Sequence, residues 1–190
     1  MKHHLKLLLL GSSGVGKTTL LRQWTSSTFA YCEPTFAIEV TSNTLRVRDN
    51  VIRVRLSDTS GREYYDNIYD GYIYNADAIL LVYDTTNLDS WHKCKYWLDK
   101  VHTIVGSSPH VFIIGNKIDR ESKRVVYKDD VMSVVRHSDI NNIHTMECSA
   151  KSGENARYIY HMILSSLDIP EKEVWMQIDE EDNKSRCNIV

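Results

Sequence analysis

The sequence contains no apolar stretch that approaches the roughly 20 residues of a membrane-spanning helix. Its first ten residues hold only a short apolar run, residues 7–10, and no cleavage site of the secretory type. We therefore expect neither a membrane span nor a signal peptide. The four cysteines, Cys32, Cys94, Cys148 and Cys187, form no C-x-x-C pair and no zinc-ligand spacing. We interpret them as reduced thiols of a cytosolic protein.

Neither sign of charge dominates the chain. Its 190 residues carry a net charge of −2, from 23 Lys and Arg against 25 Asp and Glu, which argues against a nucleic-acid binder that depends on bulk basicity. Hydrophobic residues make up 42% of the chain and charged residues 25%, so a buried core is expected rather than wholesale disorder. We place one domain at residues 1–167 and a flexible tail at residues 168–190, where an acidic run at 179–182 follows the last periodic segment.

Apolar runs alternate along the chain with segments of helical spacing. The continuous apolar runs at residues 78–83 and 111–115 are typical of parallel strands buried on both faces. We expect further strands at residues 5–10, 37–46, 51–58 and 143–148, and helices at residues 17–24, 90–105, 129–137 and 155–167. This order predicts an α/β fold with a mostly parallel six-stranded sheet and helices on both of its faces.

The segment GSSGVGKT at residues 11–18 matches the pattern G-x-x-x-x-G-K-[ST] in full. It follows an expected strand and opens an expected helix, so its backbone N–H groups and the helix N-terminus favour an anion. We expect Lys17 to reach the outer phosphates of a nucleotide and the hydroxyl of Thr18 to coordinate Mg²⁺. A glycine-rich turn without a ligand is the alternative. The expected phosphate-binding residues are Ser13, Gly14, Val15, Gly16, Lys17, Thr18 and Thr19.

The sequence NKID at residues 116–119 points to the base. The carboxylate of Asp119 can accept hydrogen bonds from the N1–H and 2-amino groups of guanine, a pair of donors that adenine lacks. We expect Asn116 to tie neighbouring loops together and the stem of Lys117 to lie along the ring. A solvated turn is the alternative for so short a motif. The sequence SAK at residues 149–151, at the end of the next strand, favours guanine.

Together these motifs resemble those of the Ras superfamily of small GTPases, over residues 5–167. The resemblance implies a fold of the P-loop NTPase type. It also implies that the ligands are GTP or GDP with Mg²⁺ and that GTP is hydrolysed to GDP. The sequence DTSG at residues 58–61 looks like the D-x-x-G motif of the family, which implies that Asp58 holds Mg²⁺ through water and that the Gly61 amide touches the γ-phosphate. Thr35 would be the second magnesium hydroxyl. The resemblance further implies guanine contacts from Phe29, Ser149, Ala150 and Lys151, and a catalytic group of Lys17, Thr35, Gly61 and Arg62.

Within the superfamily, ADAILLVYDTTN at residues 76–87 is most similar to Rab proteins. That similarity implies a monomeric switch in vesicle traffic, with an exchange factor, a GTPase activator and switch-region effectors as partners, and without nucleic acid. Many Rab proteins expose three aromatic residues to effectors. The matching positions here are Val40, Ser57 and Tyr72, so we do not transfer partner identities.

Three positions depart from the family pattern. Arg62 replaces the usual Gln that orients the attacking water, and Arg has five donors but no acceptor. We expect slow intrinsic hydrolysis, because losing one positioned transition-state partner costs about 3 kcal/mol, roughly a hundredfold in rate. Alternatively Arg62 swings into solvent, or the protein is a non-hydrolysing GTP-binding scaffold. Ser13 stands where Ras has Gly. The spacing from Phe29 to Thr35 is one residue short, so we expect a strained loop there.

The sequence ends with CNIV, a C-a-a-X form that predicts prenylation of Cys187, with a free thiol as the alternative. One lipid chain gives reversible membrane binding unless a second signal helps. The acidic tail offers only Lys184 and Arg186 as nearby cations, which is poor support at an anionic membrane. We expect a cytoplasmic protein that cycles with the cytosolic face of membranes, with a soluble carrier that shields the lipid.

Overall fold

The computed structural model describes residues 4–25, 33–47, 50–167, 169 and 174–177. The strands are β1 (His4–Leu10), β2 (Ile38–Val47), β3 (Asn50–Thr59), β4 (Ala78–Asp84), β5 (His110–Asn116), β6 (Asn142–Cys148) and β7 (Val174–Gln177). The α-helices are α1 (Lys17–Thr25), α2 (Asp70–Asn75), α3 (Leu88–Val105), α4 (Lys128–Arg136) and α5 (Ala156–Ser166), with 3-10 helices η1 (Glu63–Tyr69) and η2 (Ile118–Lys123). None of the helices in these ranges combines the length and hydropathy that a bilayer crossing requires.

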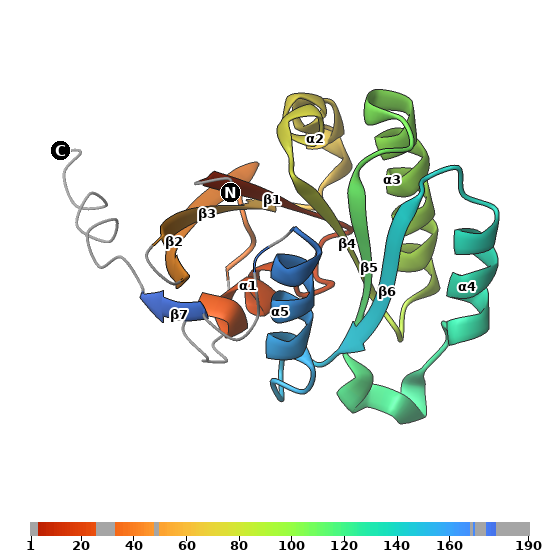
Figure 1. Ribbon diagram of the computed structural model, residues 1–190. Coiled ribbons are helices and arrows are strands. Elements are labelled where there is room, and N and C mark those ends of the chain that lie inside the picture. The colour runs from red at the N-terminus through yellow and green to blue at the C-terminus, as the bar shows by residue number, and fades with distance from the viewer. Residues whose placement is uncertain (1–3, 26–32, 48–49, 168, 170–173, 178–190) are drawn as a thin grey trace, which may run out of the picture.

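The strands form one sheet in the order β6-β5-β4-β1-β3-β2-β7 (Figure 1). Neighbours from β6 to β3 run parallel, whereas β2 is antiparallel to both β3 and β7. The α/β class, the mostly parallel sheet and all six expected strands are confirmed. The seventh strand, β7, was not expected. It comes from the segment that the sequence assigns to the tail, and it pairs with Thr44–Val47 of β2.

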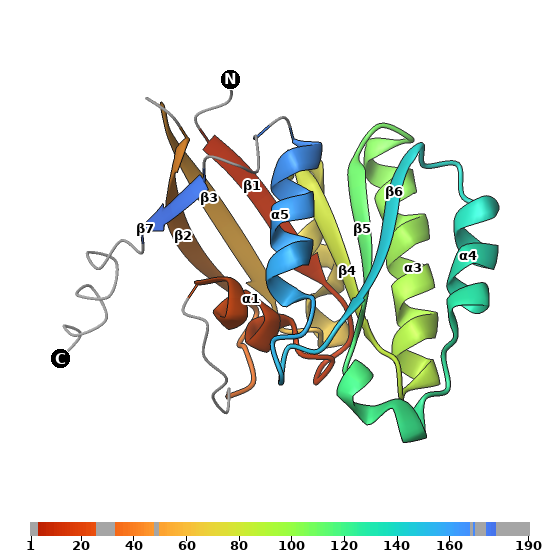
Figure 2. The same ribbon diagram turned by 60° about the horizontal axis from the view of Figure 1, so that its bottom comes forward.

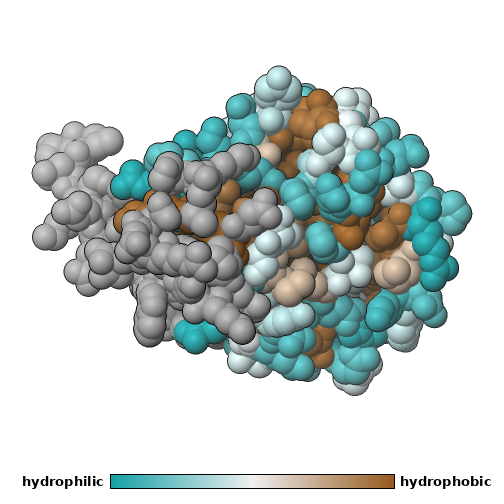
Figure 3. Space-filling model, in the orientation of Figure 1, coloured by the Kyte–Doolittle hydropathy of each residue, from teal (hydrophilic) through white to brown (hydrophobic). Residues whose placement is uncertain are grey.

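Two apolar layers lie on opposite faces of the sheet. On one face, Leu5, Leu7 and Leu9 of β1 pack with α1 and α5. On the other face, Leu8 and Leu10 pack beneath α2, α3 and α4 (Figure 2). This alternation is the period of a strand buried on both sides. The outward surfaces of the helices are mostly hydrophilic, and one apolar patch shows at the end of the molecule where α2 lies (Figure 3).

Helix α1 is tied to the opposite end of the chain by polar and aromatic contacts. Gln23 Nε2 donates to the carbonyl of Ala150 at 2.9 Å, and Trp24 Nε1 donates to the carbonyl of Ala156 at 2.8 Å. The rings of Trp24 and Tyr160 stack with centroids 5.2 Å apart. These contacts hold the last turn of α1 against the loop after β6 and against α5. Because β1, β3, β4, β5 and β6 run parallel, their carboxyl ends meet at one edge of the sheet, where α/β folds place their ligands.

Candidate functional site

A groove of about 460 Å³ runs along this edge of the sheet. Its walls come from the loop between β1 and α1, the segment before β2, the end of β3 and the loops after β5 and β6. The residues that line it are Ser13, Gly14, Gly16, Lys17, Thr18, Thr19, Glu33, Pro34, Thr35, Thr59, Ser60, Asn116, Lys117, Asp119, Arg120, Ala150 and Lys151. Most of the residues that the sequence singled out for nucleotide binding thus share one groove. Phe29 and Cys187 lie outside the described residues.

The loop between β1 and α1 wraps around the ammonium group of Lys17. Gly14 and Gly16 have φ of 77° and 99°, values that favour glycine. Lys17 Nζ donates to the carbonyls of Gly11 and Ser12 at 2.8 and 2.9 Å. Burial lowers the pKa of Lys17 to about 8, and the charge of Asp58 opposes this shift. An anion in the groove would favour the charged form of this buried amine.

Three side-chain oxygens converge at the other flank of Lys17. The hydroxyl of Thr18 donates to Asp58 Oδ2, and Thr35 Oγ1 lies 3.1 Å from Thr18 Oγ1 and 3.2 Å from Asp58 Oδ2. Burial raises the pKa of Asp58, and hydrogen bonding to Thr18 and the charge of Lys17 oppose the shift. Asp58 Oδ1 is buried and has no hydrogen-bond partner among the described residues. Hydroxyl and carboxylate oxygens with one site left over suit Mg²⁺ and its water.

Thr35 reaches this cluster although its spacing from Phe29 is one residue short. Within the part that the structure describes, the backbone strain falls two residues later, at Ala37, whose φ is 53°. Ala37 is fixed by its carbonyl, which accepts from Ser60 N at 2.9 Å. The left-handed turn at Ala37 directs the chain from the groove into β2.

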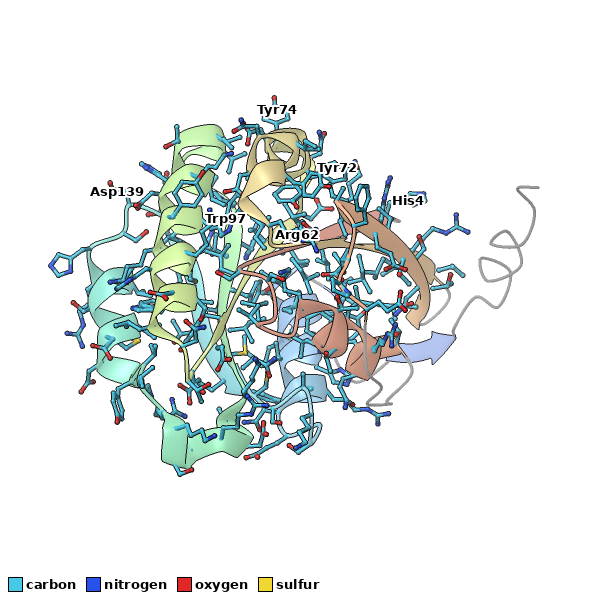
Figure 4. All side chains as sticks on the ribbon, turned by 180° about the vertical axis from the view of Figure 1, so that it is seen from behind. His4, Arg62, Tyr72, Tyr74, Trp97 and Asp139 are labelled. Carbon is cyan, nitrogen blue, oxygen red and sulfur yellow. The ribbon has the colours of Figure 1, made fainter. Side chains whose placement is uncertain are left out.

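Gly61 packs directly against the loop at residues 11–18, which is called the phosphate loop from here on. A Cβ added to it would lie 2.5 Å from the carbonyl oxygen of Gly11 and 2.6 Å from Lys17 Nζ, and its φ is 70°. Arg62 follows at the rim (Figure 4): it is exposed and does not line the groove, and its guanidinium has no hydrogen bond or ion pair to a described residue. Its backbone N donates to Ser60 Oγ at 3.2 Å. The predicted catalytic group is therefore split, with Lys17, Thr35 and Gly61 at the loop and Arg62 outside.

A buried tyrosine joins the two segments that flank the groove. The hydroxyl of Tyr69 donates to the carbonyl of Ala37 at 3.2 Å and lies 3.3 Å from Ser60 Oγ. Burial raises the pKa of this hydroxyl, and its hydrogen bond to Ser60 acts in the opposite direction. The ring packs against Trp97 of α3, with centroids 5.8 Å apart. Sequence reasoning missed this bridge, because nothing in the D-x-x-G motif marks Tyr69.

Two lysines of α3 hold the segment that follows Arg62. Lys93 pairs with Asp66 at 2.5 Å, and Lys100 pairs with Asp70 at 2.6 Å while donating to the carbonyl of Asp66 at 2.9 Å. The residue Asp66 is buried, so this pair is shielded from solvent. Both ammonium groups lie 5.5 Å from the ring centroid of Trp97. The segment after Gly61 is thus anchored to α3 by residues of this chain.

At the other end of the groove, Asn116 joins three loops. Its Nδ2 donates to the carbonyl of Val15 at 2.8 Å, and its Oδ1 accepts from the backbone N of Lys117 and of Ala150 at 2.8 and 2.9 Å. The residue is buried. This geometry agrees with the expectation that Asn116 ties neighbouring loops together. Gly16 has no room for a Cβ because the Asn116 amide lies against it.

Asp119 stands exposed at the mouth of the groove, and Ser149 Oγ donates to its Oδ1 at 2.6 Å. Lys117 bridges inward: its Nζ donates to the carbonyl of Gly14 at 2.7 Å and pairs with Asp84 at 2.7 Å. Burial alone would raise the pKa of Asp84, but hydrogen bonds from Lys117 and Thr86 lower it overall. These contacts aim the Asp119 carboxylate at the groove and fix the stem of Lys117 above the phosphate loop.

Three residues near the groove were not among the site residues expected from the sequence. Asp84 ends β4 and holds Lys117, while Glu33 and Arg120 line the groove. Arg120 has a non-helical backbone within η2, with φ −108° and ψ 38°. Asp84 was detectable as a polar residue at the carboxyl end of an apolar run. Glu33 and Arg120 were not, because they stand beside expected site residues without belonging to a pattern themselves.

A glycine loop wrapped around a buried lysine, at the carboxyl edge of a mostly parallel sheet, defines a P-loop nucleotide-binding protein. A family model described as "Ras family" matches residues 6–168, and the chain belongs to that family. Its members are small GTPases that act as GTP-binding switches, bind GTP or GDP with Mg²⁺, and are served by exchange factors, activators and effectors.

Proposed function

We propose that this protein is a slow GTP-hydrolysing switch of the Rab type that acts in membrane traffic. The observation that carries the nucleotide assignment is the continuity of the groove. One wall holds the buried ammonium of Lys17, and the far mouth holds the Asp119 carboxylate braced by Ser149. A cation at one end and an acceptor of purine donors at the other fit a guanine nucleotide bound along its length.

Different residues of the groove would bind the phosphates and the Mg²⁺ ion. Lys17 and the loop amides hold the phosphates, and the oxygens of Thr18, Thr35 and Asp58 would hold Mg²⁺. When bound, Mg²⁺ neutralises charge that develops on the phosphates during transfer. A γ-phosphate between Lys17 and Gly61 would draw both flanking segments inward, and its loss would release them.

Base selection is tested by Asp119→Asn. An amide in place of the carboxylate offers a donor where guanine also presents one, so we expect the affinity for GDP to fall by at least roughly a hundredfold. Displacement of a fluorescent GDP analogue by GDP, GTP and ATP measures this, with the exposed Asp139→Asn as a matched control. The assignment fails if ATP displaces the analogue as well as GTP does, or if Asp119→Asn leaves the preference unchanged.

Slow hydrolysis is supported by the position of Arg62, exposed at the rim and without an acceptor for water. In single-turnover assays we expect Arg62→Gln to hydrolyse GTP roughly a hundredfold faster than the wild type. Arg62→Ala is the control, since it removes the guanidinium without supplying an amide. Equal rates for the wild type and Arg62→Gln would overturn this part of the proposal.

A non-hydrolysing GTP-binding scaffold is the second candidate function, and the same exposed Arg62 favours it. The two candidates differ in one measurement. Phosphate release over time, with and without a cell extract that supplies an activator, stays at background for a scaffold and rises with the extract for a switch.

The traffic role draws its support from the sequence at residues 76–87 and from Cys187. Of the three positions that would meet effectors, Val40 is exposed, Tyr72 is half-buried and Ser57 is buried. Attachment to membranes through a prenyl group on Cys187 is tested by Cys187→Ser. A variant that remained on membranes as fully as the wild type would contradict the anchor.

A further inference from the structure

One end of the sheet carries an exposed basic patch, defined here as His4, Lys6, Arg53 and Arg55. The strand register pairs His4 with Arg53 and Lys6 with Arg55, so the four side chains share one face of β1 and β3. All four are exposed, whereas the residues between them on these strands are buried beneath the opposite layer. Helix α2 covers this face only further along β1, as Figure 4 shows for Tyr72 and His4.

The cations of the patch are not neutralised by their surroundings. Among the described residues, none offers an acidic side chain to Lys6, Arg53 or Arg55 at ion-pair distance. The acids on neighbouring elements are otherwise engaged or turned away. Asp77 accepts from the backbone N of Lys6 at 2.9 Å, Asp70 pairs with Lys100 at 2.6 Å, and Glu39 sits opposite Asp58 on the other face of the sheet.

A hollow of about 390 Å³ opens beside the patch. Lys6 and Arg55 line it together with Ser57, Ile68 and Tyr72. Two cations of the patch therefore border an amphipathic hollow that residues of α2 also line.

The last described residue of the chain, Gln177, lies near the patch. Strand β7 ends at Gln177, which pairs with Thr44 of β2, and Thr44 in turn pairs with Arg53. Two strand spacings of about 4.8 Å put the backbone of Gln177 about 10 Å from that of Arg53. Because β7 is antiparallel to β2, the chain leaves Gln177 in the direction of Ser42, the β2 partner of Arg55.

The acidic run begins two residues after Gln177. Residues 179–182 read DEED, four consecutive acids. An extended chain spans about 3.4 Å per residue, which gives residues 179–182 a reach of roughly 7–17 Å from Gln177. The distance to the patch is therefore shorter than the reach of the segment, and the charges are opposite.

We propose that the basic patch binds the acidic segment 179–182 of the same chain. Exposed ion pairs are individually weak, but the attachment through β7 makes the encounter intramolecular and raises the effective concentration of the segment. The contact excludes acidic segments of other proteins from Lys6 and Arg55. This consequence for partner choice rests on the proposed switch function, whereas the contact itself does not.

The test compares amide NMR spectra of the full chain with those of a variant in which the four acids become amides. Spectra are taken at about 0.1 M and about 1 M salt, where the Debye length is about 10 Å and about 3 Å. We expect the amide signals of Lys6, Arg53 and Arg55 to differ between the two proteins at the lower salt and to coincide at the higher. The variant carries Asp179→Asn, Glu180→Gln, Glu181→Gln and Asp182→Asn.

A matched control neutralises two exposed acids far from the patch, Asp139→Asn with Glu154→Gln; Asp139 and His4 lie on opposite sides of the molecule in Figure 4. The patch signals should not move in this control. In the reverse experiment, Arg53→Gln with Arg55→Gln should shift the signals of residues 179–182.

Patch signals that are identical in the wild type and the four-acid variant at the lower salt overturn the proposal. If polyglutamate added to the four-acid variant moves the patch signals while the native segment does not, the surface serves an external acidic partner and the proposal is wrong. None of these NMR measurements depends on GTP hydrolysis. A failure of this proposal can therefore be distinguished from a failure of the proposed switch function.

Discussion

Replacing Tyr69 by Phe would remove the hydroxyl that bridges Ala37 and Ser60 and keep the rest of the side chain. The ring would still pack against Trp97, so the apolar contact is preserved. The change therefore isolates one buried hydroxyl that joins the two segments beside the phosphate loop.

The expected loss of stability depends on which hydrogen bonds Ala37 and Ser60 keep in the Tyr69→Phe variant. The carbonyl of Ala37 keeps its bond from Ser60 N at 2.9 Å, and Ser60 Oγ keeps its bond from Arg62 N at 3.2 Å. The proton of Ser60 Oγ loses its acceptor, since the hydroxyl of Tyr69 donates onward to Ala37. One lost bridge with one unpaired donor lowers the free energy of unfolding by about 1–2 kcal/mol.

For a domain of this size that loss lowers the Tm by roughly 2–8 °C. Calorimetry at one fixed GDP concentration measures it, because bound ligand itself raises the Tm. Tyr72→Phe is the matched control: the hydroxyl of Tyr72 bonds to no described residue, and its removal should leave the Tm unchanged. Equal Tm values for Tyr69→Phe and Tyr72→Phe would refute the bridge.

Two further changes test the guanine end of the groove. Asn116→Ala should lower the free energy of unfolding of nucleotide-free protein by about 3 kcal/mol, because it strands the carbonyl of Val15 and the amide of Ala150 in a buried site; urea denaturation measures this, and a loss under about 1 kcal/mol would contradict the link. Asp84→Asn tests the pair with Lys117. The folded pKa of Asp84 lies below the ordinary value of 3.8, so its charged form contributes stability above that value and loses it as the pH falls through the folded pKa. The Tm difference between Asp84→Asn and the wild type should be present at neutral pH and shrink below about pH 4; a difference that is constant down to pH 3 would oppose the reasoning.

The central strands and the phosphate loop were predictable because their sequence demands are local. A strand buried on both faces must be apolar throughout, as residues 78–83 are. The loop at residues 11–18 must wrap tightly, and Gly11 cannot be substituted because a Cβ would meet the carbonyl of Val82. Such constraints involve consecutive residues only, so they can be recognised in a single sequence.

The features that were not predicted depend on distant partners. Tyr69 and Ala37 are 32 residues apart, and Lys93 and Asp66 are 27 apart. No spacing rule connects such pairs before the fold is known. The strand β7 escaped notice for a related reason: four residues that pair mainly through their backbone need no particular side-chain period.

Because β7 is short, it pairs with only one part of β2 and leaves the other part without a partner strand from β7. Over Thr44–Val47 the outer backbone groups of β2 are engaged by β7, so no strand from another chain can add there. Over residues 38–43 of β2, β7 offers no pairing. A protein that docks by adding a strand to β2 is thereby confined to residues 38–43, the stretch of β2 that begins three residues after Thr35.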